Sequence, residues 1–159
     1  RIRKGKGVKS AVADRICDLG RFGQKTGAGY FRYEKGDRTP IPDPDVEKII
    51  VEVASEQGIT RRKIGEAEIL ARLLYPMVNE GAKILEEKIA IRASDIDVIW
   101  VYGYGWPVYR GGPMFWADQV GLKTIRDRMN EWRKTQGEEW TPAPLLDLLA
   151  SEGKTFTGA

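Results

Sequence analysis

Apolar side chains recur at helical spacing through most of the chain after residue 43, and the clearest stretch spans residues 64–88. Its apolar positions repeat with a period of about 3.6 residues and form one broad stripe, which is typical of an amphipathic helix. The stripe consists of Ile69, Leu70, Leu73, Leu74, Met77, Val78, Ala82 and Leu85. We therefore expect this segment to be the main core helix, with the stripe turned toward its neighbours.

Shorter segments of the same periodicity lie on both sides of that helix. Asp43 or Asp45 can cap a helix that precedes it, and Ser94 can cap a short helix that ends near Tyr102. Apolar residues at helical spacing also predict a helix after Gly121, namely Leu122, Ile125, Met129 and Trp132.

Prolines and glycines set the remaining boundaries. Proline suits the first turn of a helix, so Pro113 begins a helix that Gly121 ends, and Pro142 and Pro144 open the last helix. Together the pattern predicts a mainly α protein, with a helical bundle of five or six helices over residues 43–151.

The N-terminal part is predicted to be a mixed extension. Residues 10–19 form a helix with Val12, Ile16 and Leu19 on one face, and residues 29–34, "GYFRYE", alternate as a short strand does. Residues 35–45 hold three prolines and charged turn residues, which is typical of a linker.

Composition limits the class of protein. The chain has 159 residues, of which 42% are hydrophobic, and it has no apolar run of the roughly 20 residues that span a bilayer. The first residue is Arg1 rather than methionine, which suggests a piece of a longer protein. With Cys17 alone no internal disulfide is available, and we expect this thiol to be a small buried hydrophobe.

Charge is concentrated at the N-terminus, where residues 1–25 carry eight basic and two acidic side chains. Such a segment can bind phosphate groups, but a solvated linker is the simpler interpretation. We expect no nucleic-acid binding, because the basic segment has no aromatic residue before Phe22.

Candidate chemistry is sparse. The chain has no histidine, which removes the commonest general base near neutral pH and the commonest metal ligand. Neighbouring carboxylates such as Glu86 with Glu87, or Glu138 with Glu139, do not face each other on a helix. Residues 20–29, "GRFGQKTGAG", lack the spacing of a phosphate loop and the strand of a dinucleotide-binding turn. We therefore predict no catalytic, cofactor-binding or metal site in this chain.

The stretch "GYGWPVYRGGP", residues 103–113, is the most distinctive. Its glycines allow chain reversals, and its aromatic rings are too large to remain in water, so we expect them to pack between helices. Contact with a ligand is the less favoured interpretation. The packing or substrate-cleft candidates are Tyr75, Tyr104, Trp106, Tyr109, Met114, Phe115 and Trp116.

The segment "ARLLYPMVNEGAKILEEKIAIRASDIDVIWVYGYGWPVYRGGPMFWADQVGL", residues 71–122, closely resembles the C-terminal domain of 3-hydroxyacyl-CoA dehydrogenases. It is most similar to the second copy of that domain in multifunctional enzymes of fatty-acid β-oxidation. Residues 20–34, "GRFGQKTGAGYFRYE", resemble the segment that closes the first copy. The resemblance implies that residues 1–34 end the first repeat, 35–44 link the repeats, and 45–159 form the second repeat.

In that family the catalytic His and Glu belong to a nucleotide-binding domain, and the first repeat supplies an Asn where this chain has Ala71. The resemblance therefore implies an NAD-dependent parent enzyme, and such fused proteins carry enoyl-CoA hydratase as a further activity. It also implies that this fragment is inactive and binds no cofactor by itself. Its implied partners are the missing nucleotide-binding domain and first repeat, acyl-CoA as the parent's substrate, and a second copy of the fragment.

Two further expectations remain open. A free-standing helical protein-interaction module is the alternative to the dehydrogenase part. The final residues "KTFTGA" lack a peroxisomal Ser-Lys-Leu signal, which favours a bacterial cytoplasm.

Overall fold

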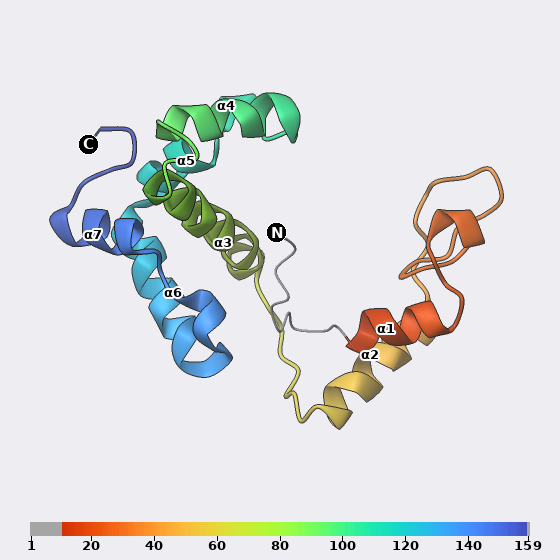
Figure 1. Cartoon of the computed structure of the whole chain (residues 1–159). Coiled ribbons are helices and arrows are strands. Elements are labelled where there is room, and N and C mark those ends of the chain that lie inside the picture. The colour runs from red at the N-terminus through yellow and green to blue at the C-terminus, as the bar shows by residue number, and fades with distance from the viewer. Residues whose placement is uncertain (1–10, 159) are drawn as a thin grey trace. The chain divides into compact units, whose positions relative to one another are not determined.

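The computed structural model describes residues 11–158, which divide between Lys63 and Ile64 into two compact units. The first unit contains α1 (Ala11–Asp18), the 3-10 helix η1 (Gln24–Thr26) and α2 (Pro44–Glu56). The second contains α3 (Glu66–Glu86), α4 (Ala93–Gly103), η2 (Val108–Arg110), α5 (Pro113–Val120), α6 (Leu122–Gln136), η3 (Glu138–Trp140) and α7 (Pro144–Glu152). The mainly α prediction is confirmed, and Figure 1 shows how these elements follow one another.

In the first unit, α1 packs on α2 through a small apolar core of Ile16, Val46, Ile49 and Val53. Asp43 caps α2 as predicted, because its Oδ1 accepts the Asp45 backbone N–H at 3.1 Å. The expectation of a buried Cys17 is wrong: Ile16 occupies the position against α2, and Cys17 is exposed beside it.

The predicted strand over residues 29–34 is also wrong. Within the described part of the chain this region has only isolated bridges, which Arg32 makes with Ala28 and Ile41. Two glycines just before this segment, Gly23 and Gly27, adopt φ values of 90° and 74°. These left-handed conformations reverse the chain direction, so no extended strand pairing forms.

In the second unit α3 is central, and α4, α5 and α7 contact it while α6 packs on α5 and α7 (Figure 1). The deepest apolar side chains are Val78, Ala82, Met114, Ala117, Ile125, Met129 and Leu146. Gly81 lets α5 approach α3 closely, because a Cβ there would lie 2.5 Å from the Met114 sulfur. The predicted buried stripe of α6 is confirmed in all four of its members.

Two details of the predicted helices need correction. The α3 stripe is only partly buried, because Val78 and Ala82 lie in the core while Leu73 is 62% exposed. The capping residue of α4 is not Ser94. Instead, Asp95 Oδ2 accepts the Arg92 backbone N–H at 3.0 Å and its carboxylate pairs with the Arg92 guanidinium.

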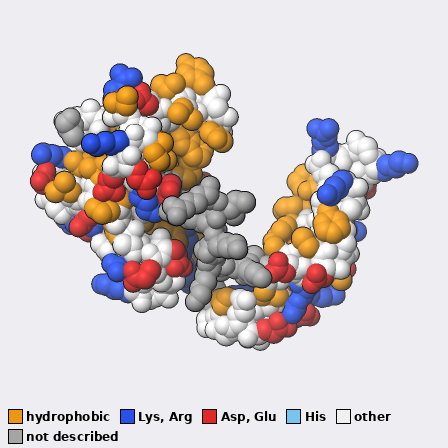
Figure 2. Space-filling view, viewed as in Figure 1, with side chains coloured by type: hydrophobic (Ala, Val, Ile, Leu, Met, Phe, Trp, Pro, Cys, Tyr) orange, Lys and Arg blue, Asp and Glu red, His pale blue; other side chains and the backbone are white. Residues whose placement is uncertain are grey.

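Helix α4 carries apolar side chains on both of its sides. Ala93 and Ile96 face the core, whereas Val98, Ile99 and Tyr102 form an exposed outer face, with Tyr102 84% exposed. Figure 2 shows hydrophobic side chains gathered over this part of the second unit. We call Val98, Ile99 and Tyr102 the α4 outer face.

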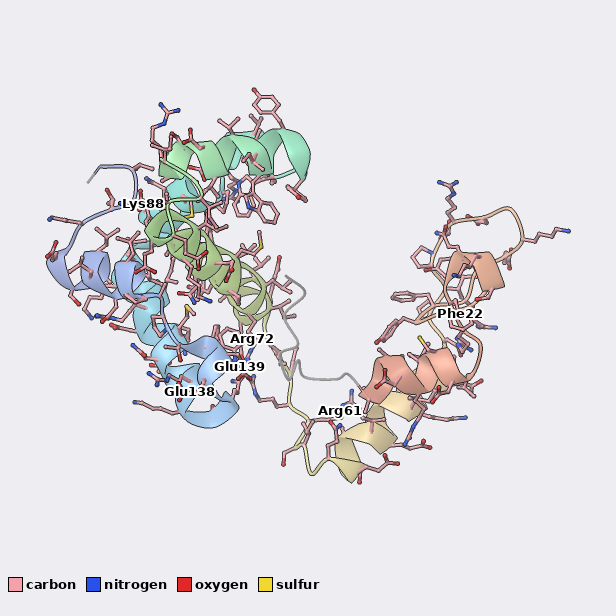
Figure 3. All side chains as sticks on the ribbon, in the orientation of Figure 1. Phe22, Arg61, Arg72, Lys88, Glu138 and Glu139 are labelled. Atoms are coloured by element: carbon pink, nitrogen blue, oxygen red, sulfur yellow. The ribbon has the colours of Figure 1, made fainter. Side chains whose placement is uncertain are left out.

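Arg72 joins α3 to α6. Its guanidinium carbon lies 4.6 Å from the centroid of the Trp132 ring, its Nε donates to Glu68 at 2.9 Å, and its Nη1 donates to Gln136 at 2.7 Å. Figure 3 labels Arg72 on α3 and Glu138 in η3, the 3-10 helix that follows α6. This arrangement fixes the first half of α3, which has few buried residues of its own.

Where one repeat ends and the next begins stays a prediction, although the division of the described residues falls after α2. None of the helices between residues 11 and 158 combines the length and the hydropathy that a membrane-spanning helix needs.

Candidate functional site

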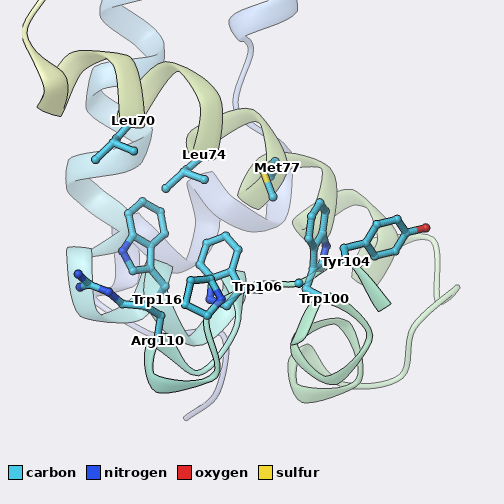
Figure 4. Close-up of a pocket in the computed structure, with 10 residues that line it drawn as sticks. Leu70, Leu74, Met77, Trp100, Tyr104, Trp106, Arg110 and Trp116 are labelled. Carbon is cyan, nitrogen blue, oxygen red and sulfur yellow. The ribbon is translucent and has the colours of Figure 1, made fainter. Parts of the chain in front are cut away.

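A groove of about 440 Å³ lies between the first half of α3 and the segment that joins α4 to α5. Its lining consists of Leu70, Leu74, Met77, Trp100, Tyr104, Gly105, Trp106, Pro107, Arg110 and Trp116. Figure 4 shows the aliphatic side chains of α3 along one wall and the tryptophan rings along the other. Hydrophobic and aromatic linings of this size are typical of sites for small ligands.

The aromatic wall is held by ring contacts. Trp106 meets Trp100 and Trp116 edge-on, with centroid distances of 6.4 and 6.1 Å. Its backbone N–H donates to the Trp100 carbonyl at 3.0 Å, which fixes the turn after α4. Trp116 in turn lies 6.2 Å from buried Tyr75, so the wall continues into the core.

Among the polar groups of the groove, the Trp106 indole has no hydrogen bond and the Arg110 guanidinium has no ion pair within the described chain. The indole Nε1 of Trp106 is buried, and it is the one buried side-chain nitrogen or oxygen in the described part of the chain without a hydrogen bond. Arg110 forms no ion pair with any described carboxylate, and its guanidinium carbon lies 5.5 Å from the Tyr109 ring centroid.

Asp97 positions the far end of this segment. Its Oδ1 accepts the Met114 backbone N–H at 2.7 Å, and its Oδ2 accepts that of Phe115 at 3.1 Å, so it caps the start of α5. Gly112 is required beside it, because φ there is 98° and a Cβ would lie within 2.3–2.5 Å of the Asp97 side chain. Burial raises the pKa of Asp97, while the two backbone N–H groups oppose that rise.

The structure brings three of the seven candidate residues together in the groove: Tyr104, Trp106 and Trp116. Tyr75 and Met114 are buried behind it, the latter completely. Tyr109 and Phe115 do not line the groove, and Tyr109 is 81% exposed.

Sequence reasoning missed other members of the lining. Leu70, Leu74 and Met77 were visible as part of the α3 stripe, and their spacing of four and three residues places them on one side of the helix. Arg110 lies inside the quoted 103–113 stretch. Asp97 has no such signal in the sequence, because no local pattern connects it with residues 114 and 115.

The groove offers binding rather than acid–base chemistry. The lining contains no carboxylate, and its acidic or basic side chains are those of Tyr104 and Arg110. The lining therefore offers no pair of groups that could act as acid and base. Among residues 11–158 no group of carboxylates and thiols is placed to hold a metal ion. The carboxylate pairs have structural partners: Glu86 accepts the Leu145 backbone N–H at 2.7 Å, and Glu138 pairs with Arg133.

Comparison with known proteins gives one consistent result. Residues 69–157 match the family described as 3-hydroxyacyl-CoA dehydrogenase, C-terminal domain. The chain is 43% identical over 145 residues to the peroxisomal bifunctional enzyme of Danio rerio and 41% identical over 145 residues to that of Homo sapiens, covering 89% of this chain and 20% of the relative in each case.

Plant relatives and a solved structure agree. A peroxisomal fatty acid beta-oxidation multifunctional protein of Oryza sativa is 34% identical over 88% of this chain and 20% of its own. The crystal structure of the dehydrogenase part of multifunctional enzyme 1 from C. elegans matches with a TM-score of 0.66 and 28% identity, over 87% of this chain and 32% of that one. The chain thus spans about a fifth of the length of these curated relatives.

Proposed function

Since this chain belongs to the 3-hydroxyacyl-CoA dehydrogenase C-terminal domain family, we propose that it is the non-catalytic helical part of an NAD-dependent L-3-hydroxyacyl-CoA dehydrogenase that acts in fatty-acid β-oxidation. In this proposal its helices complete the assembly and shape the cleft in which the parent enzyme holds acyl-CoA. The observation that carries the proposal is the α4 outer face.

A helix that is apolar on all sides is normally buried on all sides. α4 turns Ala93 and Ile96 toward the core of its own unit, yet Val98, Ile99 and Tyr102 remain exposed, and Ile91 just before the helix is 90% exposed. Exposed apolar surfaces of this kind are typical of sites that bind another protein segment. Because the chain spans about a fifth of its relatives' length, we propose that the rest of a longer parent chain, namely its first helical repeat, covers this face.

The chain itself does not fit NAD. Dinucleotide sites use a glycine-rich turn between a strand of a parallel sheet and a helix, and residues 11–158 contain only isolated β-bridges. The family is one of NAD-dependent dehydrogenases, and the matched domain is not the NAD-binding part. We therefore propose that the other domain of the parent enzyme carries out hydride transfer and that this chain takes no part in that step.

Reconstitution tests the proposal. The purified chain, supplied with acetoacetyl-CoA and NADH, is expected to give no turnover, whereas adding the nucleotide-binding domain and first repeat is expected to form a complex with activity. Ile99→Asp should weaken that complex, because a carboxylate on the α4 outer face would be buried unpaired. Leu148→Asp is the matched control, since Leu148 is similarly exposed but lies on α7. Turnover by the chain alone, or equal complex formation by both variants, would contradict the proposal.

The same face gives two smaller proposals. Without its cover the chain should self-associate, which sedimentation at rising concentration measures, and Ile99→Asp should restore the monomer. A free-standing interaction module remains the second candidate, because the α4 outer face could equally receive an unrelated protein. The reconstitution experiment separates the two, since only the dehydrogenase part recovers activity.

We infer the cellular compartment of the parent enzyme from its relatives. The named relatives are peroxisomal enzymes of animals and plants, so the bacterial cytoplasm that the sequence favoured gains no support from them. We propose a peroxisomal setting for the parent enzyme, which localisation of the tagged full-length chain would test.

A further inference from the structure

We propose that the groove between α3 and the α4–α5 segment binds a small amphipathic monocarboxylate, which is a ligand with an apolar body and one negative charge. The proposal concerns this chain by itself. It does not depend on the dehydrogenase assembly or on the α4 outer face, because Val98, Ile99 and Tyr102 do not line the groove.

The walls select an apolar body. Leu70, Leu74 and Met77 supply flexible aliphatic surface from α3, and the tryptophan rings opposite them supply flat surface (Figure 4). A volume of about 440 Å³ is too large for a single side chain and lies within the range of small-ligand sites. Water would gain few hydrogen bonds along these walls, so displacing it with an apolar ligand is favourable.

The Trp106 indole supplies a hydrogen-bond donor without an acceptor. Buried indole N–H groups usually have a partner, and leaving one unpaired destabilises a protein by about 1–3 kcal/mol. The contacts of Trp106 with Trp100 and Trp116 hold the ring in place. Because Nε1 is shielded from a water-sized probe, a ligand oxygen reaches it and removes the penalty only where a neighbouring side chain of the lining shifts.

Arg110 supplies the charge. The second unit contains five other arginines, and each pairs with a carboxylate: Arg72, Arg92, Arg126, Arg128 and Arg133. Arg110 is the exception among the described arginines of this unit, and it lines the groove. No other Lys or Arg lines it, so the groove can balance one negative charge but not a polyphosphate.

Titration with decanoate tests the proposal, with decanol and decyltrimethylammonium as probes of the same chain length, all below their micelle concentrations. Binding is followed by calorimetry and by the NMR signal of the Trp106 indole N–H, which Trp106→Phe assigns. We expect decanoate to bind about tenfold more tightly than decanol, in line with a charge-assisted hydrogen bond, and the cation not to bind.

Variants locate the site. Arg110→Ala should lower decanoate affinity about tenfold and leave decanol unchanged, while Trp106→Phe keeps an aromatic ring and loses the donor, so it should lower decanoate affinity several-fold. Arg128→Ala and Trp140→Phe are the matched controls, because neither residue lines the groove.

Three outcomes would overturn the proposal. Equal affinity for decanoate and decanol would mean an apolar surface without recognition of charge, and an unchanged affinity in Arg110→Ala would place the ligand elsewhere. Absence of binding, with Leu70, Leu74 and Met77 shielded from solvent only in the longer parent chain, would make the groove a protein interface. These titrations use neither NADH nor the other domains of the parent enzyme. A negative titration therefore does not contradict the proposed function, and a negative reconstitution does not contradict ligand binding in the groove.

Discussion

At the scale of single residues, Asn79 shows how a buried polar group ties two segments together. From the middle of α3 its Nδ2 donates to the Thr141 carbonyl at 3.0 Å, and its Oδ1 accepts the Ala143 N–H at 2.6 Å. Asn79→Leu would leave both backbone groups unpaired, so we expect a loss of about 2–4 kcal/mol in the free energy of unfolding. Urea unfolding measures this. Asn130→Leu is the control, and equal losses in the two variants would argue against a role for these bonds.

Asp97 gives a prediction about pH. Burial raises its pKa, so the folded state holds this proton more tightly than the unfolded state does. Asp97 therefore favours the fold at low pH, and this contribution is lost as pH rises through the raised pKa. Asp95 and Asp127 act in the opposite direction, because hydrogen bonds from Arg92 and Lys123 lower their pKa values and their contributions disappear on acidification.

Asp97→Asn should consequently make the loss of stability on acidification steeper, because it removes a contribution that grows as pH falls. Urea unfolding of both proteins at several pH values between about 4 and 7 measures the difference, since an unperturbed aspartate titrates near 3.9. If the curves of the wild type and of the Asp97→Asn variant run parallel over this range, the raised pKa of Asp97 is wrong.

At the scale of elements, the end of α3 carries strain that one substitution should relieve. Lys88 has a φ of 57°, and it is the one non-glycine residue with positive φ in the described chain. Its N–H still donates to the Leu85 carbonyl at 3.1 Å, as in a helix that ends with a left-handed residue. Lys88→Gly should therefore raise the free energy of unfolding by roughly 0.5–1 kcal/mol.

The matched control for that prediction is Lys134→Gly in α6, where glycine should instead cost about 1 kcal/mol. Thermal unfolding of the two variants should move in opposite directions. A shared direction would mean that the backbone at residue 88 is not strained.

Local pattern was enough to predict the helices themselves, because each depends on residues close in sequence. Pro113 and Gly121 bound α5, and the apolar spacing of α6 gave its buried face. The sequence pattern could not show which apolar side chains are buried, because Leu73 belongs to the same predicted stripe as Val78 and yet is exposed. The groove depends on contacts between α3 and residues 100–116, and for that reason the sequence singled out only Tyr104, Trp106 and Trp116 among its lining residues.

At the scale of the whole molecule, the segment that joins the two units differs in character from the units themselves. Residues 57–65 belong to no helix and are exposed throughout, and they include Arg61, Arg62 and Lys63. Proteases cut exposed, irregular segments before they cut packed helices. Trypsin should therefore release, as an early and persistent product, a C-terminal fragment that begins at residues 62–64.

That fragment contains the complete core around α3, so it should keep its helical circular dichroism and its urea transition. Mass spectrometry identifies the first cut, and a variant with Arg61→Gln, Arg62→Gln and Lys63→Gln should delay it. A first cut within residues 64–159 would contradict the division of the chain at Lys63. The least protected backbone would then lie inside the second unit, which has the larger packed core.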